Sequence, residues 1–138
     1  MTATAANRAV AKTGNDSFLR FALRLDAVIS GLMGIAGVAI APRIAEMSGT
    51  TTAFEYSIGA LFIAYGVVVY HLSRKEHVRR LGIVVVVGNV VYAAAAAAVV
   101  LADLWPLTTT GIVLTLASGV YTLIMADLQY LGLRRMRA

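Results

Sequence analysis

The sequence predicts an all-α integral membrane protein, an antiparallel four-helix transmembrane bundle, and three observations support this fold class. Of 138 residues, 59% are hydrophobic and only 14% are charged, whereas soluble domains are typically about 45–50% apolar and about 25% charged. The apolar residues form four long runs without the period of an amphipathic helix or a half-buried strand. Almost all lysines and arginines lie before the first run, between the second and third runs, or after the fourth. This is expected for helices that cross a membrane back and forth.

Each run is near the length of a membrane-spanning helix, which needs about 20 apolar residues to cross a hydrocarbon layer about 30 Å thick. The first two runs are short, but flanking residues with long side chains that reach the headgroups can extend them. A membrane β-barrel is a poor alternative, because its short strands alternate in polarity and these runs are apolar on every face. The predicted spans are 25–41, 56–72, 81–102 and 107–133.

The segments outside the spans are short. Residues 1–16 are rich in alanine, threonine and asparagine, which predicts a disordered cytoplasmic tail before a membrane domain at 17–138. The residues just before the first span extend its helix, with an interfacial amphipathic turn as the alternative. A cleavable signal peptide ending at 39–41 is a further alternative, which Pro42 directly after the cleavage motif disfavours. The connections at 42–55 and 103–106 are predicted to be external turns, too short to form a domain.

The cations orient the bundle. Eleven of the 12 lysines and arginines precede the first span, lie between the second and third, or follow the fourth, and Arg43 is the one cation on the other side. The positive-inside rule therefore places both termini in the cytoplasm. The net charge of +5 predicts anionic lipid headgroups as partners. Nucleic acid is not expected, because the cations are dispersed at helix ends without interleaved aromatic residues.

The two halves of the sequence are weakly similar to each other. A shift of 57 residues aligns Gly88 with Gly31. A shift of 60 residues aligns three pairs in the second and fourth spans: Gly119 with Gly59, Tyr130 with Tyr70, and Arg134 with Arg74. Two copies of a helical hairpin explain these matches. They are equally explained without duplication, because spans that cross the membrane in the same direction require similar residues at their ends.

Small residues recur at spacings that suit close helix packing. Within the first span, Ser30 and Gly34 are four residues apart, as are Gly37 and Ala41. Small side chains let helix backbones approach closely, which replaces the hydrophobic driving force inside a lipid bilayer. We expect packing contacts at Gly31, Gly34, Gly37, Gly88 and Gly119. The partners are expected within the chain, and contacts with another membrane protein or a second copy are the alternative.

Polar residues inside the spans are the best functional candidates, because each is costly in hydrocarbon without a partner. Helix geometry places Tyr65 and Asn89 at the same depth, about 13 Å from the arginines that flank their spans. The predicted polar site in the cytoplasmic half of the bundle consists of Asp26, Ser30, Tyr65, Asn89 and Asp127. One hypothesis is a proton or cation relay with Asp127 as the titrating group. The favoured alternative is that Asp26 and Asp127 are neutralised by nearby arginines such as Arg24 and Arg134.

Several classes of chemistry are not expected. Cysteine is absent, which excludes disulfides and thiolate metal sites. His71 and His77 do not form a metal-binding spacing with the acidic residues. There is no nucleophile elbow, phosphate-binding loop or HExxH motif. The sequence therefore predicts a protein without catalytic residues, metal or cofactor.

Short motifs run through the membrane domain. The first span opens with LRLDAV at 23–28, the third contains Gly88-Asn89, and the fourth closes with GLRR at 132–135. This pattern, which covers most of the chain after residue 20, resembles small integral membrane proteins of actinobacteria. The resemblance implies a four-helix plasma-membrane protein. Because that group has no assigned activity, it implies no catalytic residues.

Two functions follow from these observations. The first is a non-enzymatic accessory or interaction subunit of the cell membrane, whose glycine and alanine faces contact a partner. The second is a small transporter or channel-like oligomer that uses the polar site in the cytoplasmic half. The lack of an acidic residue at 28–41 in the first span is unlike the small multidrug transporters, which carry a glutamate there.

Overall fold

The computed structural model describes the backbone of residues 2–137 and the side-chain surroundings of residues 15–136. Its described residues form five helices and no strand. The helices are α1 (Thr2–Ala39), α2 (Ala41–Ser48), α3 (Thr52–Leu72), α4 (Val78–Leu101) and α5 (Thr109–Arg137). The predicted all-α four-helix bundle is confirmed, with α2 as a short addition.

Four helices are long and apolar enough to cross a membrane. The candidate spans are Asn15–Ala39, Thr52–Leu72, Val78–Leu101 and Thr109–Met136. The first begins well before the predicted 25–41, because polar residues at its start continue the helical turns instead of interrupting them. Helix α1 itself begins at Thr2, so the predicted boundary between a tail at 1–16 and a domain at 17–138 has no counterpart in the secondary structure. The alanine-rich start of the chain has a high helix propensity, which is consistent with the start of α1 at Thr2.

Helix α2 occupies most of the connection that the sequence analysis treated as a turn. Pro42 lies in its first turn, where a missing N–H costs no hydrogen bond. Gly49 ends it with φ at 79°, and the Gly49 N–H donates to the Ala45 carbonyl over 3.0 Å. Thr51 then caps α3, since its hydroxyl accepts from the Phe54 N–H at 3.1 Å. Proline in the first turn and glycine just after the last turn are typical signals of a short helix.

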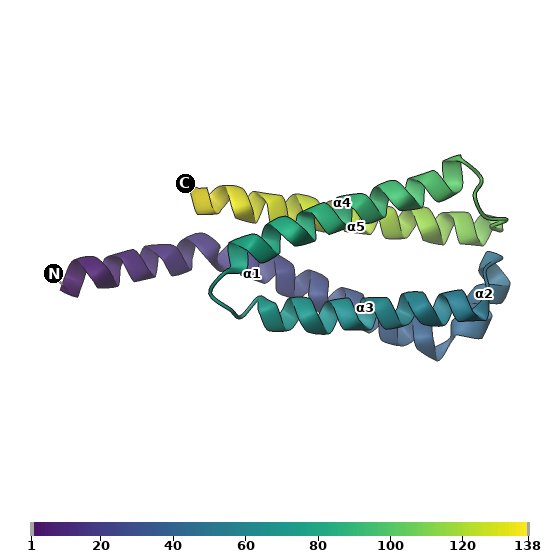
Figure 1. Ribbon diagram of the computed structural model, residues 1–138, viewed down its shortest axis with the longest axis horizontal. Coiled ribbons are helices and arrows are strands. Elements are labelled where there is room, and N and C mark those ends of the chain that lie inside the picture. The colour runs from purple at the N-terminus through teal and green to yellow at the C-terminus, as the bar shows by residue number, and fades with distance from the viewer. Residues whose placement is uncertain (1, 138) are drawn as a thin grey trace.

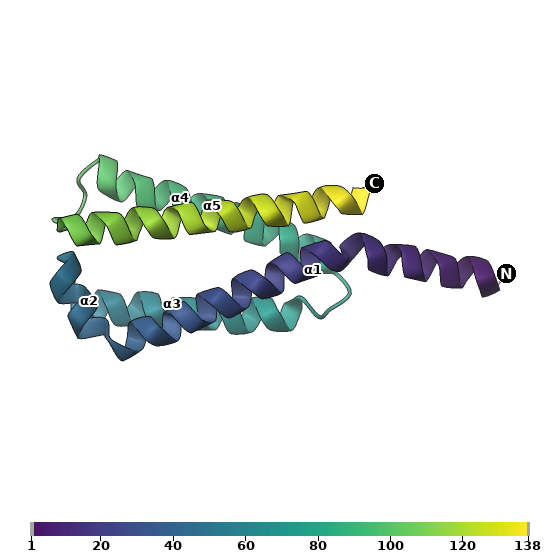
Figure 2. The same ribbon diagram turned by 180° about the vertical axis from the view of Figure 1, so that it is seen from behind.

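The helices form two hairpins (Figures 1 and 2). Helix α1, followed by α2, packs along α3, and α4 packs along α5. The hairpins meet mainly through α1 and α5, whereas α3 and α4 contact each other little. Both chain ends and the 73–77 connection lie at one end of the bundle, here called the terminal end. Helix α2 and the 102–108 connection lie at the other, here called the α2 end.

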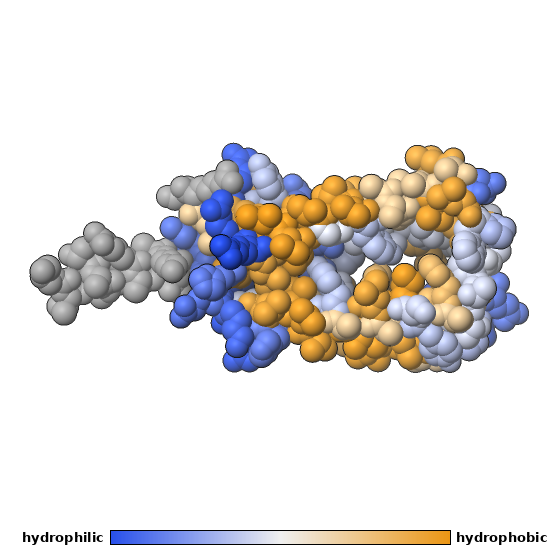
Figure 3. All heavy atoms as spheres, in the orientation of Figure 1, coloured by the Kyte–Doolittle hydropathy of each residue, from blue (hydrophilic) through white to orange (hydrophobic). Residues whose placement is uncertain are grey.

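The best-packed part of the core lies toward the terminal end. It is formed by buried side chains from all four long helices: Leu19, Leu23, Ala27, Val69, Val78, Val85 and Leu133. Backbones are also close there, because a Cβ added at Gly132 would lie 2.7 Å from the Cα of Leu19. The outer surface of the bundle is largely apolar between two polar ends (Figure 3), as a membrane-spanning protein requires.

Glycines on α1 and α3 let these two helices touch through their backbones. A Cβ added at Gly34 would lie 2.6 Å from the Gly59 carbonyl oxygen and 2.8 Å from the Ile63 nitrogen. One added at Gly66 would lie 3.0 Å from the Cα of Gly31. The small residues of the first span are therefore used within the chain.

Of the other predicted packing glycines, Gly119 is closely packed and Gly37 and Gly88 are not. An added Cβ at Gly119 would be 3.3 Å from the Cβ of Ala96, which is a close contact between α4 and α5. At Gly37 and Gly88 it would meet no atom within 4 Å. The expectation of close packing was wrong for these two, because a small residue permits close packing without requiring it. Both instead line the space between the hairpins.

Candidate functional site

Asp26 on α1 is the centre of a buried polar cluster. Its side chain is fully buried, with 0% exposed surface. Carboxylate oxygen Oδ1 accepts hydrogen bonds from the Ser30 hydroxyl at 3.0 Å and the Tyr121 hydroxyl at 2.9 Å. Ser30 lies one helical turn after Asp26 on the same face of α1, whereas Tyr121 reaches it from α5.

The second carboxylate oxygen, Oδ2, accepts three more hydrogen bonds. They come from the Tyr65 hydroxyl on α3 at 2.7 Å, the Asn89 amide on α4 at 3.1 Å and the Gln129 amide on α5 at 2.8 Å. The Asn89 amide also donates to Gln129 Oε1 at 3.0 Å. All four long helices thus meet at one carboxylate.

No basic side chain among the described residues pairs with Asp26. The Arg24 Nε donates to the Ser73 hydroxyl at 3.3 Å. Arg20 donates to the Ser73 carbonyl at 2.5 Å and pairs with Asp16 at 3.1 Å. These arginines therefore hold the end of α3, and the predicted neutralisation of Asp26 by Arg24 was wrong. The charge of Asp26 is instead compensated by hydroxyl and amide dipoles.

The structure brings together Asp26, Ser30, Tyr65 and Asn89, as the predicted site requires, but not Asp127. Asp127 is exposed on the outer face of α5. Two residues along a helix rotate by about 200°, so Asp127 and the buried Gln129 point in nearly opposite directions. The depth argument for Asp127 was sound, but depth does not specify the side of a helix.

Two members of the cluster, Tyr121 and Gln129, were not predicted from the sequence. Gln129 is 0% exposed, and Thr122, Met125 and Ala126 are buried on the same stripe of α5. Their recurrence every three to four residues is the signal that identifies this inward face. Tyr121 lies beside Thr122 and about two turns from Gln129, where that stripe faces the centre of the bundle.

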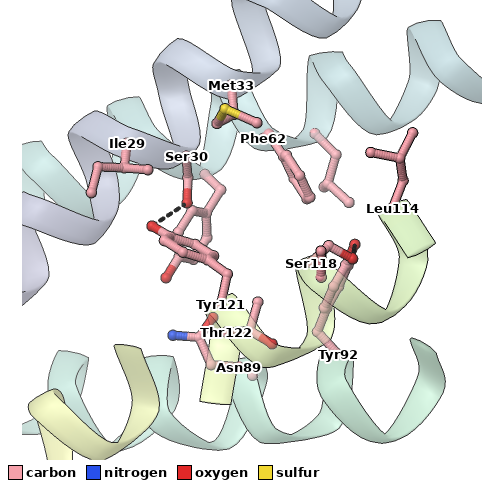
Figure 4. Close-up of a pocket in the computed structure, with 14 residues that line it drawn as sticks. Ile29, Ser30, Met33, Phe62, Asn89, Tyr92, Leu114, Ser118, Tyr121 and Thr122 are labelled. Carbon is pink, nitrogen blue, oxygen red and sulfur yellow. Dashed lines mark hydrogen bonds between the residues drawn. The ribbon is translucent and has the colours of Figure 1, made fainter. Parts of the chain in front are cut away.

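A cavity of about 440 Å³ adjoins the cluster (Figure 4). Four lining residues that donate to Asp26 form its polar side, here called its floor: Ser30, Tyr65, Asn89 and Tyr121. Apolar side chains including Met33, Phe62 and Leu114 form its walls. Residues from α1, α3, α4 and α5 all contribute. The floor residues separate the cavity from Asp26, which does not line it. Small-molecule sites in proteins have this size and this combination of apolar walls with a few polar groups.

The cavity continues toward the α2 end. A second cavity of about 420 Å³ shares Met33, Phe62, Tyr92, Leu114 and Ser118 with the first and extends to Trp105. The two therefore form one cleft between the hairpins, which we call the interhairpin cleft. Figure 3 shows a hollow on the face where α3 and α4 lie. The cleft exists because α3 and α4 diverge from the packed terminal end toward the α2 end.

Polar contacts join the hairpins again at the α2 end. The Thr108 N–H donates to the Ser48 carbonyl at 3.1 Å, and the Trp105 indole donates to the Gly49 carbonyl at 3.2 Å. The Trp105 ring also stacks on Phe54 at 6.0 Å between centroids. We call these contacts the clasp. The interhairpin cleft thus lies between the clasp and the Asp26 cluster.

Comparisons with known proteins add no identity. No protein family matches the sequence, and neither a curated protein nor a solved structure is detectably similar to it. In the part of the chain whose side chains are described, no three histidine, aspartate or glutamate residues are grouped as a metal site would need. The function must therefore be argued from the geometry of the cleft.

Proposed function

We propose that this integral membrane protein is a small non-enzymatic transporter that binds an amphipathic molecule in the interhairpin cleft. The observation that carries the proposal is the position of the buried Asp26 carboxylate behind the floor of a cleft that extends to the α2 end. Buried charges inside membrane proteins are costly and commonly mark the path of a substrate. The apolar walls suit the body of such a molecule, and the polar floor suits its head.

The packing of the hairpins supports transport. The terminal end is filled by core side chains such as Leu19 and Leu133, so the cleft does not continue to that end, and its hollow opens on the face where α3 and α4 lie (Figure 3). Each hairpin is internally tight, whereas α3 and α4 contact each other little. Movement of one tightly packed pair of helices against another is how many carriers alternate access to a fixed site.

The alternative function is the accessory or interaction subunit. Its expected contact surface was the glycine and alanine faces of the helices. Of these residues, Gly31 and Gly34 pack against α3 within the chain, which weakens the case for a partner protein at these two positions. The hydroxyls of Ser30, Tyr65 and Tyr121 are held by hydrogen bonds to Asp26, which suits a structural and binding role for them.

We propose a plasma-membrane location with both termini in the cytoplasm. The cations at the terminal end support this orientation, since 11 of the 12 flank that side. They also suit anionic lipid headgroups as partners there. In this orientation the interhairpin cleft lies on the outer side of the Asp26 cluster, with the clasp between it and the outer surface.

The proposal is tested by extracting the protein together with its surrounding lipids, using a styrene–maleic acid copolymer. Mass spectrometry then identifies the small molecules and proteins that accompany it. Ala117→Trp fills the interhairpin cleft, and Val120→Trp adds the same side chain to the exposed outer face of α5. We expect a small molecule in equal amounts with the wild type and Val120→Trp, and much less with Ala117→Trp. A stoichiometric protein partner without any small molecule would support the accessory role instead.

A further inference from the structure

The hydrogen-bond donors that line the cavity next to the Asp26 cluster are already in use. Six hydroxyl residues line it: Ser30, Tyr65, Tyr92, Ser118, Tyr121 and Thr122. Three of them donate to Asp26, as described above. A hydroxyl has only one proton to donate but two lone pairs to accept with, so these three offer a ligand only acceptor oxygens.

The other three hydroxyls donate to protein groups as well. Tyr92 donates to the Ser118 hydroxyl at 3.0 Å, and Ser118 donates to the Thr115 carbonyl at 2.7 Å. Thr122 donates to the Gly119 carbonyl at 2.9 Å. Each of the six hydroxyls therefore presents an acceptor and no donor to the cavity.

The amide of Asn89, the one amide in the floor, also presents an acceptor and no donor to the cavity. Asn89 donates one N–H to Asp26 and the other to Gln129, so its carbonyl oxygen Oδ1 is the group left for a ligand. Behind this floor lies the Asp26 carboxylate, and no described basic side chain pairs with it. The floor thus offers unused acceptors, and the carboxylate behind it is held by hydrogen bonds without a described basic partner.

We infer that the interhairpin cleft selects a protonated amine attached to an apolar body. This inference rests on the proposed function and specifies its substrate class. An ammonium group supplies three N–H donors and a positive charge, which match the acceptors and the charge of the floor. A carboxylate or phosphate head would meet lone pairs and like charge, so the cleft rejects anionic amphiphiles.

The depth of the site favours a free amine over a bilayer lipid. Asp26 lies 13 residues before Ala39 at the end of α1, which is about 20 Å along the helix axis. The core packed around Leu19 and Leu133 closes the nearer, terminal end, so a lipid headgroup at the α2 end would have to leave the surface of the membrane to reach that depth. A small amine with an apolar tail reaches it through the interhairpin cleft.

The test uses three probes with the same eight-carbon tail: octylammonium, octanol and octanoate. Radiolabelled octylammonium is bound to the full-length protein in phosphatidylcholine nanodiscs, and empty nanodiscs give the background. We expect saturable binding that unlabelled octylammonium displaces and that octanol and octanoate do not.

Nanodiscs containing phosphatidylethanolamine distinguish the sources of the amine. Loss of octylammonium binding there would assign the site to a lipid amine, and unchanged binding would assign it to a free amine.

Variants locate the binding. Asp26→Asn removes the charge with little change of shape, and we expect octylammonium to bind about tenfold more weakly, since charge-assisted hydrogen bonds are the strong ones. Asp127→Asn removes a charge from the exposed face of α5 and leaves the affinity unchanged. Displacement by octanol and octanoate as strong as by octylammonium would overturn the amine selectivity while leaving ligand binding intact. If octylammonium does not bind but native extraction yields a small molecule, the amine selectivity is wrong and the proposed function stands. If native extraction also yields no small molecule, the proposed function itself fails.

Discussion

Asp26 on α1 and Gln129 on α5 lie 103 residues apart in the chain, and the Gln129 amide donates to the Asp26 carboxylate over 2.8 Å. Neither side chain has any exposed surface. The contact joins the first hairpin to the second inside the membrane, where an unpaired amide or carboxylate would be costly. The same contact holds the carboxylate behind the floor of the interhairpin cleft, so stability and binding are linked at this point.

The first prediction concerns the cost of removing this carboxylate. Asp26→Leu leaves buried donors on Tyr65, Asn89 and Gln129 without their acceptor, and we expect the free energy of unfolding to fall by about 3 kcal/mol. Asp127→Asn is the matched control, and it should change the free energy of unfolding by less than about 0.5 kcal/mol. Loss of helical circular dichroism during titration with sodium dodecyl sulfate measures both. Equal losses for the two variants would mean that the buried cluster does not stabilise the bundle.

The second prediction compares two glycines of α1. Gly34→Ala brings a Cβ within 2.6 Å of the Gly59 carbonyl oxygen, so α1 and α3 must separate, and we expect a loss of about 2 kcal/mol. Gly37→Ala meets no atom within 4 Å, and the better helix propensity of alanine should add up to about 1 kcal/mol. The same titration measures both variants. Similar effects at the two positions would contradict the backbone contact at Gly34.

The third prediction concerns the clasp. Gly49 has φ at 79°, and a Cβ added there would lie 2.7 Å from the Pro106 carbonyl oxygen. Gly49→Ala is therefore strained in its backbone and pushes the 102–108 connection away. Trp105 is the one tryptophan of the chain, so acrylamide quenching of its fluorescence reports the change. We expect stronger quenching than in the wild type, and unchanged quenching would show that the clasp tolerates the substitution.

The fourth prediction concerns orientation. The chain contains no cysteine, so single substitutions give an unambiguous labelling site. Glu76→Cys lies in the connection at the terminal end, and Thr109→Cys lies at the start of α5 near the α2 end. We expect a membrane-impermeant maleimide to label Thr109→Cys in intact cells and Glu76→Cys only after permeabilisation. The opposite pattern would reverse the proposed direction of the interhairpin cleft.

Much of the fold follows from the sequence because long apolar runs have few physical alternatives in a bilayer. The number of spans follows from these runs. Their ends do not, because polar residues such as Asp16 and Arg20 continue α1 by pairing with each other at the membrane boundary. Helix α2 does not follow from the apolar runs, because its eight residues between Ile40 and Gly49 are too few to span a membrane.

The polar site was predicted in part for a similar reason. Depth along a helix can be counted from the flanking arginines, and this count placed Tyr65 and Asn89 together correctly. Direction around a helix depends on which face the neighbouring helices cover. That information lies in the buried stripe of α5, and without it Asp127 was chosen in place of Gln129.

The most direct test of the central claim is whether the tyrosines of the cluster sense an amine. The chain has six tyrosines, and labelling the ring carbon that carries each hydroxyl with ¹³C gives one NMR signal for each, assigned through single Tyr→Phe variants. On titration of the protein in nanodiscs with octylammonium, we expect the signals of Tyr65 and Tyr121 to shift saturably. Those of Tyr56, Tyr70 and Tyr130, which lie outside the interhairpin cleft, should stay in place. Equal shifts of all six signals, or none at Tyr65 and Tyr121, would contradict ligand binding next to Asp26.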